Sequence, residues 1–244
     1  MIEAAFWGGL AASALLMGAI LAFVFEIPKR TQGLVLAFGA GTLIGAVAYE
    51  LLEEAIDISM RGIDVAIGFG LGAVVFYLGS IRIDALSPKV AEGMESKRDP
   101  RTSGLALVLG AVLDGIPESI VLGLSLVAGE GISVAVLVAV FVSNLPEGLS
   151  ASADLNAAGL PRQRILGVWG LVVVASAVAA AIGYGLLGQM GPHVTVILNS
   201  FAAGAILAML AESMIPEAYE QGGRAVGLMT TLGFAVAAAL SFQT

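Results

Sequence analysis

Eight apolar segments, each about as long as a membrane-crossing helix of roughly 20 residues, make up most of this chain. They lie at 4–26, 31–54, 63–81, 103–128, 131–155, 165–188, 193–216 and 222–242. Of the 244 residues, 58% are hydrophobic and 12% are charged, a balance that is not typical of a soluble domain. The sequence therefore predicts one all-α integral membrane domain over residues 1–244, embedded in a lipid bilayer.

Basic residues fall almost entirely on one side of this predicted bundle. If the N-terminus lies outside, ten of the eleven Lys and Arg residues lie in inside loops, and only Arg61 lies outside. The ten are Lys29, Arg30, Arg82, Lys89, Lys97, Arg98, Arg101, Arg162, Arg164 and Arg224. Because cytoplasmic loops are enriched in Lys and Arg, we expect a multi-pass cell-membrane protein with both termini outside. The net charge of −8 argues against a nucleic-acid partner.

A weak internal repeat relates the second and seventh segments. Phe38-Gly-Ala-Gly41 begins a stretch that ends in Glu54-Ala55, and Phe201-Ala-Ala-Gly204 begins one that ends in Glu217-Ala218, at a constant offset of 163 residues. The two segments are predicted to cross the bilayer in opposite directions. This indicates an inverted repeat of helices 1–3 and 6–8 around helices 4 and 5, a 3+2+3 arrangement that is typical of transporters.

Two Pro-Glu motifs lie near the middle of successive apolar segments. The first is Asp114-Gly-Ile-Pro-Glu118 and the second is Ser143-Asn-Leu-Pro-Glu147. A carboxylate at membrane depth costs on the order of 2.5–3.5 kcal/mol, so such residues usually serve a function. A proline at that depth also removes a backbone N–H and frees a carbonyl oxygen one turn earlier.

The spacing of these motifs predicts a cage of oxygen ligands. Asp114 and Glu118 are four residues apart and share one helix face, as do Ser143 and Glu147, with Asn144 beside them. Antiparallel packing of the two helices brings both faces together. Three carboxylates, an amide and a hydroxyl suit a divalent cation. The alternative is that the prolines only kink the helices and the acids stay protonated or paired.

The two motifs resemble those of the ZIP family of divalent metal transporters, whose fourth and fifth helices carry His-Asn-x-Pro-Glu-Gly-like sequences. The eight segments, the outside termini and the 3+2+3 repeat resemble that family as well. The resemblance implies a metal centre between helices 4 and 5 and inward transport of zinc, iron(II), manganese or a similar ion. It also implies that Glu212 is a ligand on the exit path, and that no organic cofactor is needed.

The chain departs from the family pattern at several ligand positions. Asp114 and Ser143 stand where the family has histidines, Gly115 stands at an asparagine position, and Ser176 stands at a ligand position of helix 6. We therefore expect one metal rather than two at mid-depth. Its expected ligands are Asp114, Glu118, Ser143, Asn144 and Glu147, with Glu212 as a further ligand on the exit path. An all-oxygen set shifts the preference toward manganese or iron(II), although carboxylates also bind zinc.

Acidic residues outside the motifs have two interpretations each. Glu50, Glu53 and Glu54 cluster at the outer end of the second segment, where they either attract cations to an entrance or form a solvated helix end. Glu217 is expected at the membrane interface. Asp154 is expected at the polar end of the fifth segment, and the alternative is a role on the exit path.

A competing hypothesis is a non-transporting protein of the same fold that acts as a membrane metal sensor or scaffold. The missing histidines favour it, whereas Glu118, Asn144 and Glu147 favour transport. An enzyme is not expected, because the chain lacks His-Glu-x-x-His and a convincing Ser-Lys or Ser-His pair. A homodimer through a Gly/Ala-rich helix face is compatible with membrane packing.

Overall fold

The computed structural model describes residues 1–59, 62–86, 100–126, 131–157, 159–185 and 190–242, and every regular element within them is helical. The helices are α1 (Ile2–Val24), α2 (Lys29–Ala46), α3 (Glu53–Ile58), α4 (Gly62–Leu86), α5 (Pro100–Ser125), α6 (Val134–Ala157), α7 (Arg162–Gly185), α8 (Pro192–Met209), α9 (Ile215–Gly222) and α10 (Val226–Ser241). Two π-helical segments, η1 (Val47–Leu52) and η3 (Leu210–Met214), and a 3₁₀ turn, η4 (Gly223–Ala225), join consecutive helices. The predicted all-α class is confirmed.

Six segments of the described chain are long and apolar enough to cross a membrane. They are Ile2–Val24, Lys29–Ile58, Gly62–Ile83, Val134–Ala157, Arg162–Gly185 and His193–Ser241. The last is 49 residues long and contains α10 and all of α8 except Pro192. The predicted count of eight crossings remains a prediction. Arg61 and the basic residues between 87 and 99, which contribute to the predicted orientation, lie outside the described residues.

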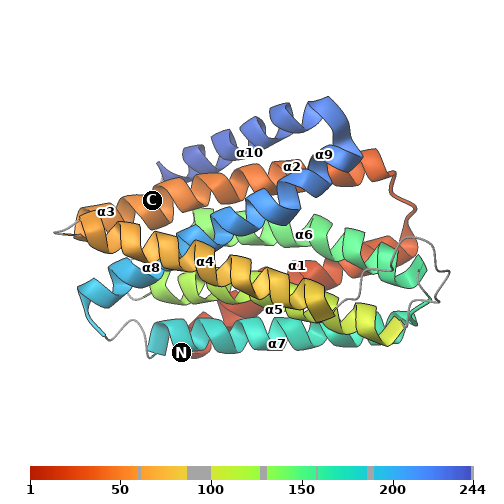
Figure 1. Ribbon diagram of the computed structural model, residues 1–244, viewed down its shortest axis with the longest axis horizontal. Helices are drawn as coiled ribbons and strands as arrows, with labels where there is room; N and C mark the ends of the chain where they lie inside the picture. The colour runs from red at the N-terminus through yellow and green to blue at the C-terminus, as the bar shows by residue number, and fades with distance from the viewer. Residues whose placement is uncertain (60–61, 87–99, 127–130, 158, 186–189, 243–244) are drawn as a thin grey trace.

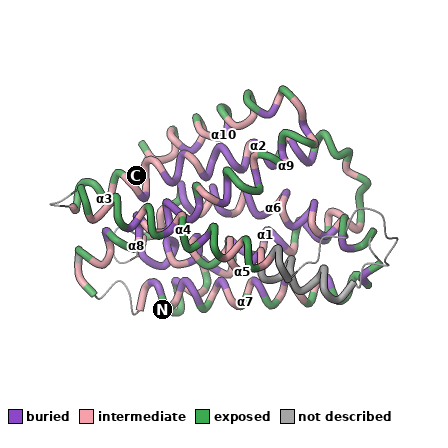
Figure 2. The backbone as a smooth tube through the Cα atoms, in the orientation of Figure 1, coloured by how far each residue is buried: buried purple, intermediate pink, exposed green. Residues whose placement is uncertain are grey.

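The helices run roughly along one common axis and form an elongated bundle, with α3 and α9 toward opposite ends (Figure 1). The most extensive packing joins α1 to α6 and α7, α2 to α10, α4 to α8, and α5 to α7. Buried residues gather on α2, α6 and α8, while much of α4 is exposed (Figure 2). The exposed residues of α4 include Ile67, Leu71, Val75 and Leu78. Such an apolar outer surface is compatible with contact to lipid.

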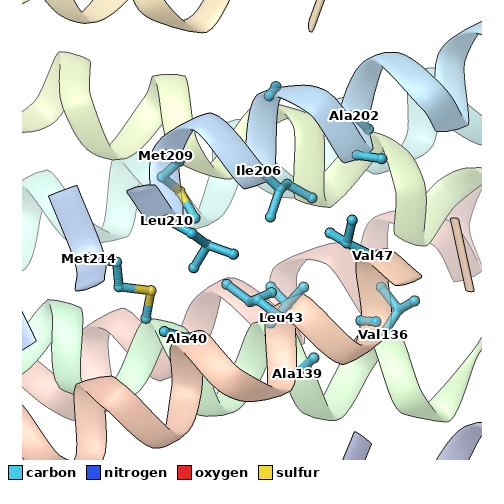
Figure 3. Packing of buried hydrophobic residues seen from close by; sticks show 14 of the residues in the cluster. Ala40, Leu43, Val47, Val136, Ala139, Ala202, Ile206, Met209, Leu210 and Met214 are labelled. Atoms are coloured by element: carbon cyan, nitrogen blue, oxygen red, sulfur yellow. The ribbon is translucent and has the colours of Figure 1, made fainter. Parts of the chain in front are cut away.

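The main core lies between α2, α6 and α8. Leu43, Val136, Ile206 and Leu210 are each less than 5% exposed and pack together there (Figure 3). In a bilayer, burying apolar side chains against one another gains little over contact with lipid tails, so van der Waals fit has to hold the helices together. Small residues such as Ala40 and Ala139 let the helix backbones approach closely enough for that fit (Figure 3).

Glycine pairs set the closest helix contacts. A Cβ atom on Gly41 would overlap the carbonyl oxygen of Thr230 on α10, and one on Gly233 would overlap that of Phe38 on α2. The contact of α4 with α8 is built in the same way. There, a Cβ on Gly72 or on Gly204 would overlap a carbonyl oxygen of the facing helix. Glycine is required at these crossings because any side chain would push the backbones apart.

The two π-helical segments occupy equivalent places in the chain. Val47 begins η1 and Leu210 begins η3, 163 positions apart, as Gly41 and Gly204 are. Each segment interrupts a long helix just before an acidic residue, Glu54 in one case and Glu217 in the other. A π-helical turn takes more residues than an α-helical turn, so it rotates the residues that follow onto a different face. The offset found in the sequence thus recurs in backbone geometry.

Candidate functional site

A cavity of about 410 Å³ lies between α2, α5, α6, α7 and the α8–η3–α9 segment. Its polar lining consists of Asp114, Glu147, Ser150, Asp154, Ser213 and Glu217. Its apolar lining includes Leu36, Ala111, Ala151, Leu155, Trp169, Met209 and Met214. The cavity therefore combines four carboxylates with walls that are largely hydrocarbon. It reaches the exposed Asp154 near the end of α6.

Two helices with internal prolines supply the motif residues. Asp114 and Glu118 lie on α5, which contains Pro117, and Ser143, Asn144 and Glu147 lie on α6, which contains Pro146. Only Asp114 and Glu147 line the cavity. The other three side chains are buried beside it, with exposed fractions of 3% for Glu118, 1% for Ser143 and 6% for Asn144.

Several carboxyl groups lie around the cavity. Asp114, Glu147 and Glu217 line it, and Glu118 is buried one helical turn after Asp114. These groups come from α5, α6 and α9, so the fold concentrates negative charge where three helices meet. Like charges in a partly buried site repel one another, and a bound cation would relieve that repulsion.

The carboxylates are electrostatic neighbours rather than a closed ligand cluster. Within the described residues, no three His, Cys, Asp or Glu side chains lie close enough together to hold one ion. Ser143 Oγ donates a hydrogen bond of 3.0 Å to the carbonyl oxygen of Val140 in its own helix. Asn144 Nδ2 donates one of 3.3 Å to the carbonyl oxygen of Ala11 on α1. The hydroxyl of Ser143 and the amide N–H group of Asn144 thus donate to backbone carbonyls.

Glu212 lies away from the cavity. It is exposed on η3, where its Oε2 accepts a hydrogen bond of 2.9 Å from Ser80 Oγ on α4. Ser213 and Glu217, four residues apart, face the cavity, and Glu212 is one residue off that face. The structure therefore does not bring Glu212 together with Asp114 and Glu147.

Glu217 is a cavity residue that was not among the predicted metal ligands. It is half-buried and lines the cavity, and its expected position at the membrane interface remains a prediction. Its Oε1 accepts hydrogen bonds from Ser150 Oγ (2.7 Å) and from Gln221 Nε2 (2.9 Å). The sequence contains one indication of the Ser150 side of this contact. Ser150 follows Glu147 by three residues, so it continues the helix face that carries the Pro-Glu motif.

An exposed ion pair lies where the cavity meets the surface. Lys29 Nζ lies 3.0 Å from Asp154 Oδ1, and both side chains are more than half exposed. It joins the first turn of α2 to the last turns of α6. A pair of this kind contributes about 0–1 kcal/mol, so it marks the mouth of the cavity without fixing its shape.

No protein-family model matches the chain. The sequence is 25% identical over 229 residues to an Arabidopsis thaliana protein named "Putative zinc transporter". The match covers 92% of this chain and 36% of that protein, so the chain spans about a third of the length of this relative. The likeness is to a zinc-transporter-like sequence. Together with the apolar helices, it indicates a multi-pass membrane protein.

Proposed function

We propose that this protein is a ZIP-like transporter that carries a divalent metal cation into the cytoplasm through a carboxylate site between α5 and α6. The observation that carries the proposal is the pair of carboxylates Asp114 and Glu147, which line one cavity inside an apolar helical bundle. Carboxylates inside a membrane domain are costly unless a charged or polar partner compensates them. The relative named as a zinc transporter supports a metal ion as the substrate and transport rather than catalysis as the activity.

The helix arrangement proposed is eight crossings in a 3+2+3 order with both termini outside. Under the 163-residue offset, α2 corresponds to α8, and the contact of α2 with α10 corresponds to the contact of α8 with α4. The recurring glycine pairs and π-helical segments support this repeat. Inverted repeats of this kind place a substrate site near mid-depth on interrupted helices, and α5 and α6 are the helices with internal prolines.

The chemistry of the cavity favours a hard cation. Its polar lining is made of carboxylates and hydroxyls, and the chain's single histidine, His193, is exposed at the start of α8 and away from the lining. Oxygen ligands suit manganese and iron(II), and they also bind zinc. Asp114, Glu118 and Glu147 are the proposed ligands at depth, with Ser143 and Asn144 at their side.

The proposed exit runs along the cavity from Glu147 to the surface. Ser150 and Glu217 come next to Glu147 along this wall, and Asp154 lies at the mouth. Successive carboxylates let a cation move between sites without a long passage through hydrocarbon. Glu212 joins this path only if η3 rotates relative to the cavity. In the structure it is bonded to Ser80 instead.

A second candidate function is a non-transporting membrane metal sensor or scaffold. It is favoured by one specific observation, namely that the described carboxylates do not form a closed cluster of three ligands. Asp114 and Ser143, in place of the family histidines, favour it as well. Metal flux separates the two functions.

The deciding experiment is uptake of zinc, iron(II), manganese, cobalt and cadmium by proteoliposomes. The test variant is Asp114→Asn with Glu147→Gln, and the control is Glu220→Gln, an exposed carboxylate on α9. We expect saturable uptake of at least one ion by the wild type and the control, and none by the double variant. Folded wild-type protein with no uptake of any ion would overturn transport in favour of the sensor or scaffold.

A further inference from the structure

Two methionine thioethers lie in the wall of the cavity. Met209 ends α8 and Met214 ends η3, and both residues line the cavity that Asp114 and Glu147 also line. They are 5% and 7% exposed, and in Figure 3 both side chains extend from the α8–η3 segment toward α2. The chain contains no cysteine, so within the described residues these thioethers supply the sulfur atoms of the cavity wall.

The π-helical segment η3 brings both methionines to one wall. Residues five positions apart lie roughly 140° apart around an α-helix, because each residue turns the chain by about 100°. In a π-helix the hydrogen bond joins residues i and i+5, so a residue five positions on lies close to one full turn away. Ser213 Oγ donates a hydrogen bond of 2.9 Å to the carbonyl oxygen of Met209, within the same turn. The backbone thus departs from α-helical geometry at the point where it places two thioethers on one wall.

The equivalent segment η1 shows that packing of this kind does not require sulfur. Under the 163-residue offset, Met209 corresponds to Ala46 and Met214 corresponds to Leu51. Ala46 directly precedes η1 and Leu51 lies within it, and each is 3% exposed. A π-helical segment at this place in the bundle therefore packs into the core with alanine and leucine. Methionine occurs in the segment that lines the cavity.

The carboxylates of the cavity leave the choice of ion open. Carboxylate oxygens suit Mg²⁺ and Ca²⁺ as well as Mn²⁺, iron(II) and zinc. A thioether is a soft ligand, so it adds affinity for the softer transition ions and little for Mg²⁺ or Ca²⁺. Methionine also fills gaps in apolar cores, and a packing role alone predicts no dependence on which ion is bound. The two roles are therefore separable by comparing ions.

We propose that Met209 and Met214 are specificity-determining residues of the cavity, and that their thioethers favour soft divalent cations over Mg²⁺ and Ca²⁺. Asp114 and Glu147 balance the charge of the ion, and thioether sulfur replaces water as a ligand on the side of the α8–η3 wall. Cd²⁺, the softest of the candidate ions, gains most from this contact, whereas Mn²⁺ depends on the carboxylates. The inference rests on the proposed function for the cavity as the place where the substrate ion binds.

The test is equilibrium binding of radioactive Cd²⁺ and of radioactive Ca²⁺ to the full chain in nanodiscs of zwitterionic lipid. The variant is Met209→Leu with Met214→Leu, since leucine has a similar volume and no sulfur. We expect it to bind Cd²⁺ about tenfold or more weakly than the wild type, a usual cost of changes around a bound metal, and to bind Ca²⁺ equally well. The matched control is Met229→Leu on α10, which removes a partly buried thioether of the main core outside the cavity lining. It is expected to bind both ions as the wild type does.

X-ray absorption by substoichiometric bound Cd²⁺ gives a second readout, which a packing role would not change. We expect sulfur among the atoms bound to Cd²⁺ in the wild type and in Met229→Leu, and oxygen alone in the leucine double variant. The cavity variant Asp114→Asn with Glu147→Gln assigns this sulfur to the cavity, because it is expected to weaken binding of both Cd²⁺ and Ca²⁺. Thermal unfolding checks that each variant is folded.

Several results would overturn the inference. They are a wild type that binds Cd²⁺ no more tightly than Ca²⁺, equal changes for both ions in the folded leucine variant, and an absence of sulfur around Cd²⁺ in the wild type. These binding measurements do not depend on transport. Absence of uptake by the wild type would overturn the proposed function and leave the binding result standing. Uptake by the wild type with unchanged Cd²⁺ binding in the leucine variant would overturn this inference alone.

Discussion

Ser150 Oγ donates a hydrogen bond of 2.7 Å to Glu217 Oε1 and so joins α6 to α9 in the wall of the cavity. The bond fixes the carboxylate that lies between the deep pair, Asp114 and Glu147, and the exposed Asp154. Hydrogen bonds to charged groups contribute about 1.5–3 kcal/mol when the groups are shielded from water. The position of Glu217 is therefore set by tertiary contacts and not by its own helix alone.

Replacing Glu217 should slow transport without unfolding the protein. In Glu217→Gln the side chain keeps its shape but loses the charge that attracts a cation leaving the deep site. A loss of about 1.4 kcal/mol of interaction with the moving ion corresponds to about tenfold lower uptake, expressed as kcat/KM. Glu220→Gln, three residues along α9 and exposed, is the matched control and should retain wild-type uptake. Equal uptake by both variants would remove Glu217 from the path.

Neutralising Glu147 should stabilise the metal-free protein while it abolishes uptake. Glu147 lines the cavity together with Asp114 and Glu217, so Glu147→Gln removes the cost of burying a carboxylate beside other carboxyl groups. For a protein of this size, each kcal/mol of stabilisation raises the melting temperature by about 2–4 °C. The measurement is thermal unfolding at pH 8 in the presence of a chelator. A lower melting temperature would show that Glu147 has a stabilising partner.

The glycines of α4 should differ sharply in their tolerance of alanine. A Cβ on Gly72 would overlap the carbonyl oxygen of Phe201, whereas a Cβ on Gly70 meets nothing within 4 Å. Gly72→Ala should therefore destabilise the protein by about 1–3 kcal/mol, the usual cost of overpacking. Gly70→Ala should leave stability unchanged or slightly higher, since alanine favours the helix. Thermal unfolding of the two variants side by side is the measurement, and equal melting temperatures would contradict the close α4–α8 contact.

The buried indole of Trp169 should be sensitive to loss of its polar partner. Trp169 is fully buried, and its Nε1 donates a hydrogen bond of 2.8 Å to Ser152 Oγ. Ser152→Ala leaves the indole N–H without that acceptor at a cost of about 1–3 kcal/mol. Trp169→Phe removes the donor but also changes the packing, so the double variant is needed to isolate the bond. If the effects of Ser152→Ala and Trp169→Phe simply add, the hydrogen bond contributes nothing to stability.

The fold class, and two of the carboxylates that line the cavity, were accessible from local sequence features. Apolar runs of helical length predicted the all-α bundle, because a bilayer leaves few other solutions. The four-residue spacing within each Pro-Glu motif indicated which side chains share a helix face. Packing then brought Asp114 and Glu147, one from each motif, to the same cavity.

The rest of the site depends on features that local patterns do not encode. A face assigned by α-helical spacing fails where a π-helical segment intervenes, and η3 ends directly before the helix that carries Glu217. Ser143 and Asn144 have the spacing predicted for ligands, and the partners of their O–H and N–H groups are backbone carbonyls of α6 and α1 that spacing alone does not identify. The hydrogen-bond partner of a side chain depends on which groups lie within its reach, and these groups are in place only when distant helices pack.

The glycine contacts of α2 with α10 and of α4 with α8 also affect the order in which the helices assemble during synthesis. The Gly41 face of α2 is covered by α10, and the Gly72 face of α4 is covered by α8. During synthesis, α2 and α4 enter the membrane well before the helices that complete them. Their glycine faces stay open to lipid until more than a hundred further residues have left the ribosome. Assembly of each half must wait for the other half to be translated.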